Sequence, residues 1–344
     1  MAQGGIQHLP VQIAYALLLL VIGNIAKALP LQVTAETNAL FAGRESPYTV
    51  TVSANPYSSV TLFWELEAKG RLLGRGEKVL HFDDRDTITT QLPIQTPPVK
   101  RGLHIGATLT IAGVNDEMPQ PHTLHHRDLF LYGPEPLSSQ YEKYRAMEIK
   151  LFDPSGTTAA MLDAAGIPYQ QVDGAALAHT ASNALIVIGV GVGLEKHGDS
   201  GDWLHALASS GRRIVMLEPS AGTLIFSPAA ADSLRQISGI RLGDAAHLPF
   251  ADLLTGQMRA HTSSQLTLQE HRGLAMVAVG QGTDARWSWF ALDYGHNGGL
   301  LALCMWPLAE DFIDHPEQHL ALGHLLAFIH GTQATTEPSK GSEE

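Results

Sequence analysis

The sequence has a single cysteine and few basic residues. Cys304 stands alone in 344 residues, so no internal disulfide bond can form. The 22 lysines and arginines are outnumbered by 34 acidic residues, which gives a formal net charge of -12, and they form no basic run. Nucleic acids and anionic lipid surfaces are bound through clustered positive charge, so neither is an expected partner. Small molecules, glycans and proteins remain as ligands.

The sequence also lacks the spacings that are typical of metal and cofactor sites. The 17 histidines are scattered, and none of them falls in a His-Glu-x-x-His pattern. His122 and His126 lie on one face of a predicted strand and His125 on the other, so a solvated face is expected there. In GVGVG at 189–193, Leu194 stands where a dinucleotide-binding motif needs its third glycine. We therefore expect no cofactor and no bound metal.

Long hydrophobic runs are scarce, and the main one lies near the N-terminus. Residues 13–26 are apolar but short for a membrane span, and an Ala-x-Ala pattern follows at residues 26–28. Residues 1–28 are therefore interpreted as a signal peptide, and a secreted or periplasmic protein is expected. Because residues 1–12 contain no Lys or Arg, the alternative of an uncleaved anchor stays open, with residues 13–28 held in a membrane.

Short alternating runs fill residues 31–132. About seven runs, separated by turn residues, are typical of an antiparallel sandwich of the immunoglobulin type. At 60–65, valine, leucine and tryptophan alternate with threonine, phenylalanine and glutamate, which predicts a strand with one buried face. The sequence therefore predicts an immunoglobulin-like β-sandwich at 29–133 and a linker at 134–147.

Beyond residue 148, predicted strands and helices alternate with short loops. Strands are predicted at 149–152, 184–193 and 212–218, with helices at 157–166 and 200–211. Ser155 is expected to cap the first of these helices and Gly166 to end it. Such alternation predicts a parallel sheet covered on both faces, in an α/β domain at 148–330. Residues 331–344 show no apolar pattern and are expected to form a disordered tail.

Three acidic residues follow the predicted strands of this sheet. In open α/β sheets, ligands bind at the carboxyl ends of the strands, where Asp153, Asp173 and Glu218 are expected. Such residues can form an acid and base pair in a polar pocket. Carboxylates in these places also cap the next helix or pair with an arginine, and this structural role is the expectation here.

The order of strands and helices, together with GRRIVMLE at 211–218, resembles the class I glutamine amidotransferase-like fold, a flavodoxin-like α/β domain. In that family, the corresponding strand ends in a sharp elbow that bears a catalytic cysteine, served by a His-x-Glu pair. Glu218 occupies the elbow position here, and Cys304 lies in a different predicted strand. Because glutamine hydrolysis needs a thiolate beside a base, the resemblance implies a domain that lacks this reaction.

A narrower resemblance spans most of residues 31–332. A strand containing Trp-Glu-Leu and the segment HHRDLFLYGPEPL precede a cysteine-less α/β domain, with further matching pieces at 246–256 and 295–329. This combination is similar to the ancillary C-terminal region of secreted glycoside hydrolase family 2 and β-galactosidase-like proteins. In those proteins, a TIM-barrel domain cuts the glycosidic bond, and this chain is too short to hold one beside the two predicted domains. The resemblance implies a non-catalytic accessory protein that binds a glycan or a protein.

A competing hypothesis is a carbohydrate-active hydrolase that uses Glu218 with Asp153 or His247 as its catalytic residues. It predicts a deep pocket in which these groups converge within hydrogen-bonding distance, with the pKa of one carboxyl raised. The binding hypothesis predicts instead that Glu218 is paired with a helix N-terminus or an arginine.

Overall fold

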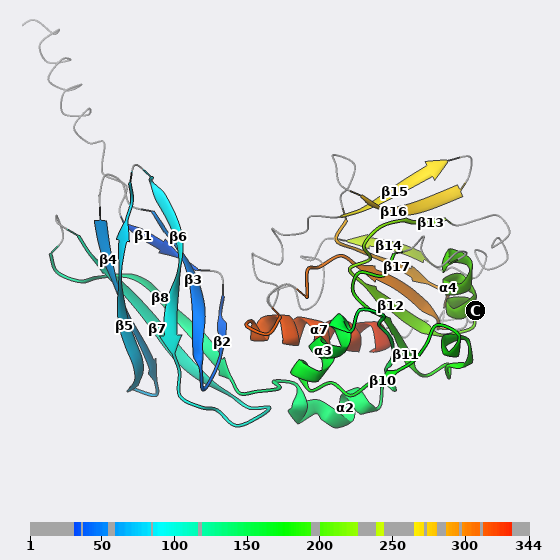
Figure 1. The fold of residues 1–344 in the computed structure, drawn as a ribbon, viewed down its shortest axis with the longest axis horizontal. Coiled ribbons are helices and arrows are strands. Elements are labelled where there is room, and N and C mark those ends of the chain that lie inside the picture. The colour runs from blue at the N-terminus through cyan, green and yellow to red at the C-terminus, as the bar shows by residue number, and fades with distance from the viewer. Residues whose placement is uncertain are drawn as a thin grey trace, which may run out of the picture. The chain divides into compact units, whose positions relative to one another are not determined.

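The structure is a computed structural model that describes most of the chain (Figure 1). The described residues are 31–35, 37–53, 59–83, 85–115, 119–193, 200–225, 239–243, 265–271, 274–280, 287–295, 298–309 and 312–331. The predicted signal peptide at 1–28, His247 and the matching segment at 246–256 lie outside this part, as does the predicted tail from residue 332 onward. Among the described helices, none has the length and apolar character needed to cross a membrane.

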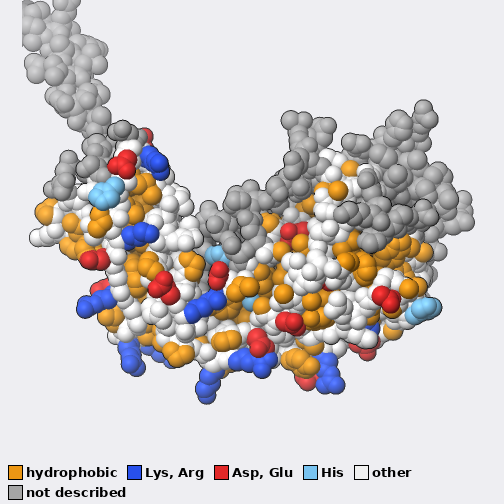
Figure 2. All heavy atoms as spheres, in the orientation of Figure 1, with side chains coloured by type: hydrophobic (Ala, Val, Ile, Leu, Met, Phe, Trp, Pro, Cys, Tyr) orange, Lys and Arg blue, Asp and Glu red, His pale blue; other side chains and the backbone are white. Residues whose placement is uncertain are grey.

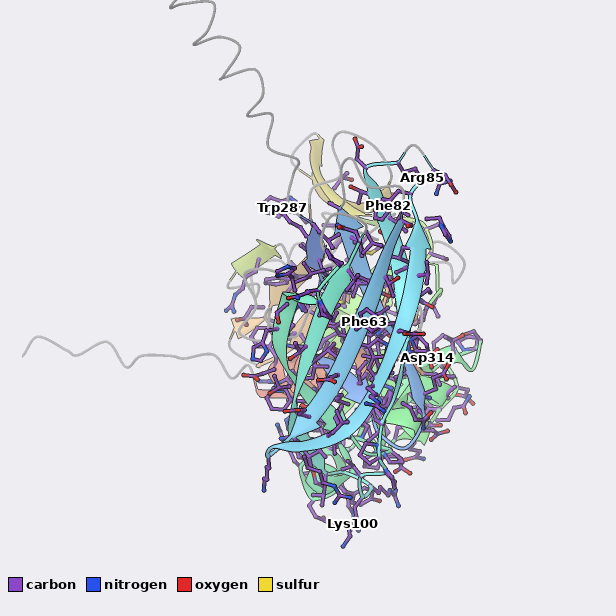
Figure 3. All side chains as sticks on the ribbon, turned by 90° about the vertical axis from the view of Figure 1, so that its left-hand side faces the viewer. Phe63, Phe82, Arg85, Lys100, Trp287 and Asp314 are labelled. Carbon is purple, nitrogen blue, oxygen red and sulfur yellow. The ribbon has the colours of Figure 1, made fainter. Side chains whose placement is uncertain are left out.

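The N-terminal part of the chain consists of β-strands (Figure 1). The strands are β1 (Gln32–Thr34), β2 (Ala39–Phe41), β3 (Glu45–Ser53), β4 (Ser59–Ala68), β5 (Arg71–His81), β6 (Thr87–Gln95), β7 (His104–Val114) and β8 (His122–Tyr132). They form a three-stranded sheet, β1-β3-β6, and a five-stranded sheet, β2-β8-β7-β4-β5. In the larger sheet, β4 pairs antiparallel with both β5 and β7, and Figure 3 shows the two sheets with Phe63 labelled. The chain is thus β-rich from its first described residues.

Alternating side chains of these strands are buried. In β4, the side chains of Val60, Leu62 and Trp64 are at most 4% exposed, whereas those between them are more accessible. Trp64 lies opposite Gly76 of β5, where an added Cβ atom would come within 2.4 Å of the indole ring. The glycine therefore leaves the space into which the tryptophan packs, and the predicted one-sided burial of this strand is confirmed.

The C-terminal part mixes strands and helices (Figure 1). The helical elements are η1 (Ser138–Gln140), α2 (Tyr141–Arg145), α3 (Thr157–Ala165), η2 (Ala176–His179), α4 (Ser200–Ser209) and α7 (Pro316–Gly331). The strands are β9 (Lys150–Phe152), β10 (Gln170–Gln171), β11 (Leu185–Ile188), β12 (Arg213–Leu217), β13 (Thr223–Ile225), β14 (Gly239–Gly243), β15 (Gln265–His271), β16 (Leu274–Gly280), β17 (Trp289–Asp293) and β18 (Leu300–Cys304). Seven of these strands form one sheet, and β13, β16 and β15 form a small antiparallel one.

The seven-stranded sheet has the order β10-β9-β11-β12-β18-β17-β14. Its first five strands are parallel, and β17 and β14 extend it as antiparallel strands. The chain moves outward from β9 to β10 and then returns to β11 on the other side of β9. The connections therefore diverge between β9 and β11, which is the place where open α/β sheets commonly bind ligands.

Both faces of this sheet are covered. In β11, Leu185 and Val187 belong to the apolar cluster that contains residues of α3 and α7. Ile186 and Ile188 face the other way and belong to the cluster that contains residues of η2 and α4. Because successive side chains of a strand point to opposite faces, this apolar strand can contribute to two cores at once.

The chain divides into two compact units. The first comprises 1–35, 48–94 and 108–127, and the second comprises 36–47, 95–107 and 128–344. Within the second unit, the Oε1 atom of Glu317 in α7 accepts hydrogen bonds from the backbone N–H groups of Asn38 and Ala39, at 3.1 and 2.9 Å. Segments far apart in the sequence are therefore held together by a buried carboxylate. The domain limits expected from the sequence, 29–133 and 148–330, stay a prediction.

Candidate functional site

Asp153 follows β9 directly and is buried, with 3% of its surface exposed. Its Oδ2 atom accepts a hydrogen bond from the Ala159 N–H in α3 at 2.8 Å, and its Oδ1 atom accepts one from the Ser155 hydroxyl at 2.8 Å. Both carboxylate oxygens thus stabilise the start of α3. The N-cap residue is Gly156 rather than the expected Ser155, although the Ser155 hydroxyl accepts a hydrogen bond from the Thr157 N–H at 3.2 Å.

Asp173 has a similar structural role after β10. Its Oδ1 atom accepts a hydrogen bond from the Ala176 N–H at the start of η2, at 2.7 Å. Unlike Asp153, this residue is exposed. Two of the three carboxylates at the edge of the sheet therefore cap the helical segment that follows them.

The glycines of GVGVG have structural roles beside Asp153. A Cβ atom at position 189 would lie 2.7 Å from Oδ1 of Asp153, so only glycine lets the backbone pass this close to the carboxylate. Gly191 has a φ of +79°, in the left-handed region that glycine adopts without strain. Between them, the Val190 N–H donates to the Thr158 hydroxyl of α3 at 2.9 Å. Close packing therefore explains the glycine at position 189, and backbone conformation explains the glycine at position 191.

Glu218 follows β12 and adopts a φ of +42°, which is uncommon for any residue other than glycine. Its backbone N–H donates to the Cys304 carbonyl at 2.7 Å, and its own carbonyl accepts a bond from the Gly191 N–H at 3.0 Å. Its Oε1 atom accepts a hydrogen bond from the Ala309 N–H at 3.0 Å. The chain therefore turns sharply at Glu218. The side chain of Glu218 is partly buried and is hydrogen-bonded to the backbone of the segment that follows β18.

Cys304 ends β18 and pairs in register with Leu217, one residue before the turn. Its side chain is fully buried, with 1% exposed. Burial raises the pKa of the thiol strongly, and the negative charge of Glu218 raises it further, although a hydrogen bond to the Trp306 backbone partly offsets both effects. A thiol with a raised pKa is a poor nucleophile at neutral pH. The thiol of Cys304 thus lies on the strand next to the one that ends in the Glu218 turn, and it is protonated at neutral pH.

Asp153 follows β9 and Glu218 follows β12 at the carboxyl edge of the sheet, with β11 between the two strands, and both oxygens of Asp153 are engaged in hydrogen bonds. His247, the other expected catalytic partner, lies outside the described residues. Among the described residues, no group of three or more histidine, cysteine or acidic side chains could hold a metal ion. At this edge Glu218 accepts a hydrogen bond from the Ala309 N–H, while Asp153 and Asp173 accept hydrogen bonds from N–H groups of the helical segments that follow them.

A second site lies in a pocket of about 490 Å³ that we call the tyrosine pocket. It is lined by Arg101, Glu135, Tyr141, Asp163, Gly166, Ile167, Pro168 and Tyr169. Arg101 forms an ion pair with Glu135, and the Tyr169 hydroxyl donates to Asp163 at 3.3 Å. Partial burial raises the pKa of Tyr169, and the nearby charge of Asp163 raises it further. The pocket therefore combines aromatic rings with oriented charged groups.

The backbone around the tyrosine pocket is unusual. Glu135 adopts a φ of +49°, a conformation that costs energy and that often occurs at functional sites. Gly166, at a φ of +74°, ends α3 and lets Glu135 approach, because a Cβ atom there would lie 3.1 Å from the Glu135 side chain. The sequence carried no signal of this pocket, because its residues come from three separate segments that only the fold brings together.

Acidic and basic side chains are interspersed on the described surface shown in Figure 2. This distribution agrees with the absence of basic runs in the sequence and offers no focused positive field to a polyanion.

Comparison with known proteins gives only distant likenesses. No protein-family model matches the sequence, and no curated protein sequence is similar to it. Solved structures with partial likeness include a Bacteroides uniformis β-glucuronidase (9% identity, 60% of this chain and 34% of that chain, TM-score 0.21). A Paenibacillus cycloisomaltooligosaccharide glucanotransferase is another (10% identity, covering 72% of this chain and 33% of that chain, TM-score 0.25). The E. coli chaperone DraB is a third (12% identity, covering 30% of this chain and 55% of that chain, TM-score 0.22). This chain spans about a third of the length of the two carbohydrate-active proteins, and TM-scores this low carry no argument about fold or function.

Proposed function

We propose that this chain is a secreted, non-catalytic accessory protein that binds carbohydrate. Its N-terminal strands would form an immunoglobulin-like sandwich, and its C-terminal part an amidotransferase-like, flavodoxin-like domain without the amidotransferase reaction. The observation that carries the proposal is Glu218, which stands at a sharp turn with positive φ where an amidotransferase would hold its cysteine.

The order of the parallel strands supports the amidotransferase-like interpretation. Numbered along the chain, β10, β9, β11, β12 and β18 have the order 2-1-3-4-5, which is common among flavodoxin-like folds. The turn at Glu218 follows the fourth of them. Because Cys304 is buried in the fifth, with the pKa of its thiol raised, the domain would lack an accessible thiolate at the turn.

The tyrosine pocket supports carbohydrate as the ligand class. Sugar rings present C–H faces that pack on aromatic side chains, and Tyr141 offers such a ring with 45% of its surface exposed. Sugar hydroxyls exchange hydrogen bonds with the fixed charged groups beside it, Arg101, Glu135 and Asp163. A pocket of about 490 Å³ falls within the usual range for small-molecule sites.

The proposal is tested by combining a screen of aryl glycosides for turnover with a glycan-binding screen. We expect no turnover by the wild type or by Glu218→Gln, and unchanged glycan binding in Glu218→Gln. Tyr169→Ala is expected to weaken binding about tenfold, because it removes an aromatic face from the pocket. Tyr169→Phe serves as the matched control, since it keeps the ring and loses only the hydroxyl that bonds Asp163.

Two results would contradict the proposal. Turnover that disappears in folded Glu218→Gln would support the competing hypothesis of a hydrolase that uses Glu218. Absence of binding to any glycan by folded wild type would reject carbohydrate as the ligand and would direct attention to a protein partner.

A further inference from the structure

A groove beside α4 suggests a second binding site that is independent of the proposed carbohydrate site. Its cavity of about 510 Å³ lies between η2 and α4, and we call it the α4 groove. The connection from β10 to β11 contains only the four-residue helix η2, so a full-length helix does not cover the sheet beside α4. The side chains of Ala175, Ala178 and Ala206 line the groove and are too small to fill it.

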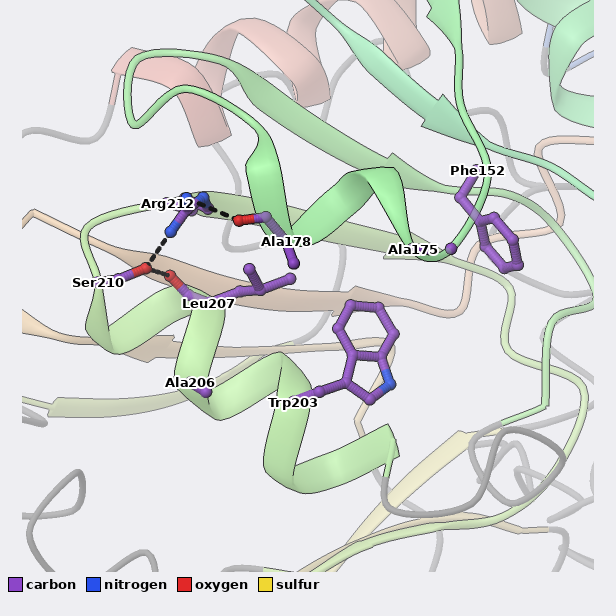
Figure 4. A pocket seen from close by; sticks show the side chains of 9 residues that line it. Phe152, Ala175, Ala178, Trp203, Ala206, Leu207, Ser210 and Arg212 are labelled. Carbon is purple, nitrogen blue, oxygen red and sulfur yellow. Dashed lines mark hydrogen bonds between the residues drawn. The ribbon is translucent and has the colours of Figure 1, made fainter.

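The two ends of the α4 groove differ in chemistry. Figure 4 shows the aromatic rings of Phe152 and Trp203 at one end, Leu207 along the wall, and Arg212 and Ser210 at the other end. Trp203 and Leu207 are four residues apart on α4 and lie on one stripe of the helix, and Ser210 follows the last helical residue directly. Seven residues of α-helix rise about 10 Å, which sets the length of an extended ligand. The groove therefore suits a ligand with an apolar body and a polar end.

Arg212 determines the charge of that polar end. Its guanidinium donates to the Thr180 carbonyl at 2.8 Å, to the Ala178 carbonyl at 3.1 Å and to the Ser210 hydroxyl. These neutral acceptors fix the guanidinium in place but leave its positive charge uncompensated, and no ion pair joins Arg212 to a carboxylate among the described residues. An arginine has five N–H donors, so two remain for a planar anionic group.

From this charge complementarity we infer that the α4 groove binds a free medium-chain monocarboxylate. The hydrocarbon chain lies against Phe152, Trp203 and Leu207, and the carboxylate pairs with Arg212. A chain of about eight carbons matches the length of the groove along α4. Burial of the chain contributes the hydrophobic part of the affinity, and the guanidinium gives selectivity for an anion.

Isothermal titration calorimetry of the full chain with sodium octanoate, below its micellar concentration, tests the inference. We expect saturable binding of one octanoate, and binding of octan-1-ol that is at least about tenfold weaker, because the alcohol lacks the charge that pairs with Arg212. Ala206→Leu should abolish octanoate binding by filling the groove. Ala160→Leu, the same change at an exposed alanine of α3, should leave it unchanged.

Arg212→Gln is expected to lower octanoate affinity at least about tenfold and to leave octan-1-ol affinity unchanged. Because Arg212 also joins α4 to η2, Ala206→Leu keeps the test valid if Arg212→Gln does not fold. Absence of saturable octanoate binding to the wild type would overturn the inference. Equal affinity for octanoate and octan-1-ol, or octanoate binding retained in folded Ala206→Leu, would also overturn it. A glycan-binding measurement on the same preparations is independent of each outcome.

Discussion

Replacing Gly299 with alanine is expected to destabilise the C-terminal sheet by at least about 3 kcal/mol. A Cβ atom at this position would lie 1.8 Å from the Ala208 carbonyl oxygen at the end of α4, and 3.3 Å from the Arg212 carbonyl oxygen. Both obstacles are backbone atoms, so no side-chain rotation can relieve the overlap. Either β18 or the end of α4 would have to move, which would disturb the hydrogen bond from the Leu300 N–H to the Arg212 carbonyl.

Gly298→Ala is the matched control for this prediction. Gly298 has a φ of +68° and no atom within 4 Å of an added Cβ, so its replacement should cost about 1 kcal/mol through backbone strain alone. Urea denaturation followed by circular dichroism measures both variants against the wild type. Equal losses in the two variants would contradict a specific collision at Gly299.

The stability of the second unit is expected to fall by about 3 kcal/mol as the pH is lowered from above 6.5 to below 4, through the protonation of His319. His319 lies in α7 with 2% of its surface exposed, stacked on Phe312 at 4.1 Å and edge-on to Phe41 at 5.0 Å. Burial lowers the pKa of His319 to about 4. A hydrogen bond with the Phe312 carbonyl opposes this shift, and the charge of Arg44 adds to it.

Stability falls with decreasing pH because the unfolded state binds a proton at His319 at a higher pH than the folded state does. The pKa in the unfolded chain is near 6.5, so between pH 6.5 and about 4 the unfolded state is protonated while the folded state is not. Stability is therefore complete above pH 6.5, decreases as the pH falls, and levels off below about 4. Folding free energies measured by urea denaturation from pH 8 to pH 4 should show this slope.

His319→Gln is expected to reduce the pH slope while keeping a donor for the Phe312 carbonyl. The comparison between the variant and the wild type is necessary because the pKa values of His324 and His330 are also lowered by burial and act in the same direction. If the two proteins have the same slope over this range, His319 is not the group responsible.

Local patterns in the sequence predicted individual elements well. The alternation at Val60, Leu62 and Trp64 predicted a strand with one buried face, because successive side chains of a strand point to opposite sides. The helix after Asp153 ends at Gly166, in the left-handed conformation that favours glycine. The cap of that helix was predicted at Ser155, and the structure places it at Gly156, while the Ser155 hydroxyl and the Asp153 carboxylate accept hydrogen bonds from the N–H groups of Thr157 and Ala159.

By itself, the sequence determined that the chain is rich in short strands, that its single thiol cannot form a disulfide bond within the chain, and that Glu218 follows a buried strand. These properties depend on residue type and on the periodicity of apolar residues over short stretches, both of which are visible in the sequence. Only the tertiary structure decided that Cys304 packs beside Glu218, that separate segments build the tyrosine pocket, and that a short η2 leaves the α4 groove open. Such features arise from contacts between residues far apart in the chain, which no local pattern encodes.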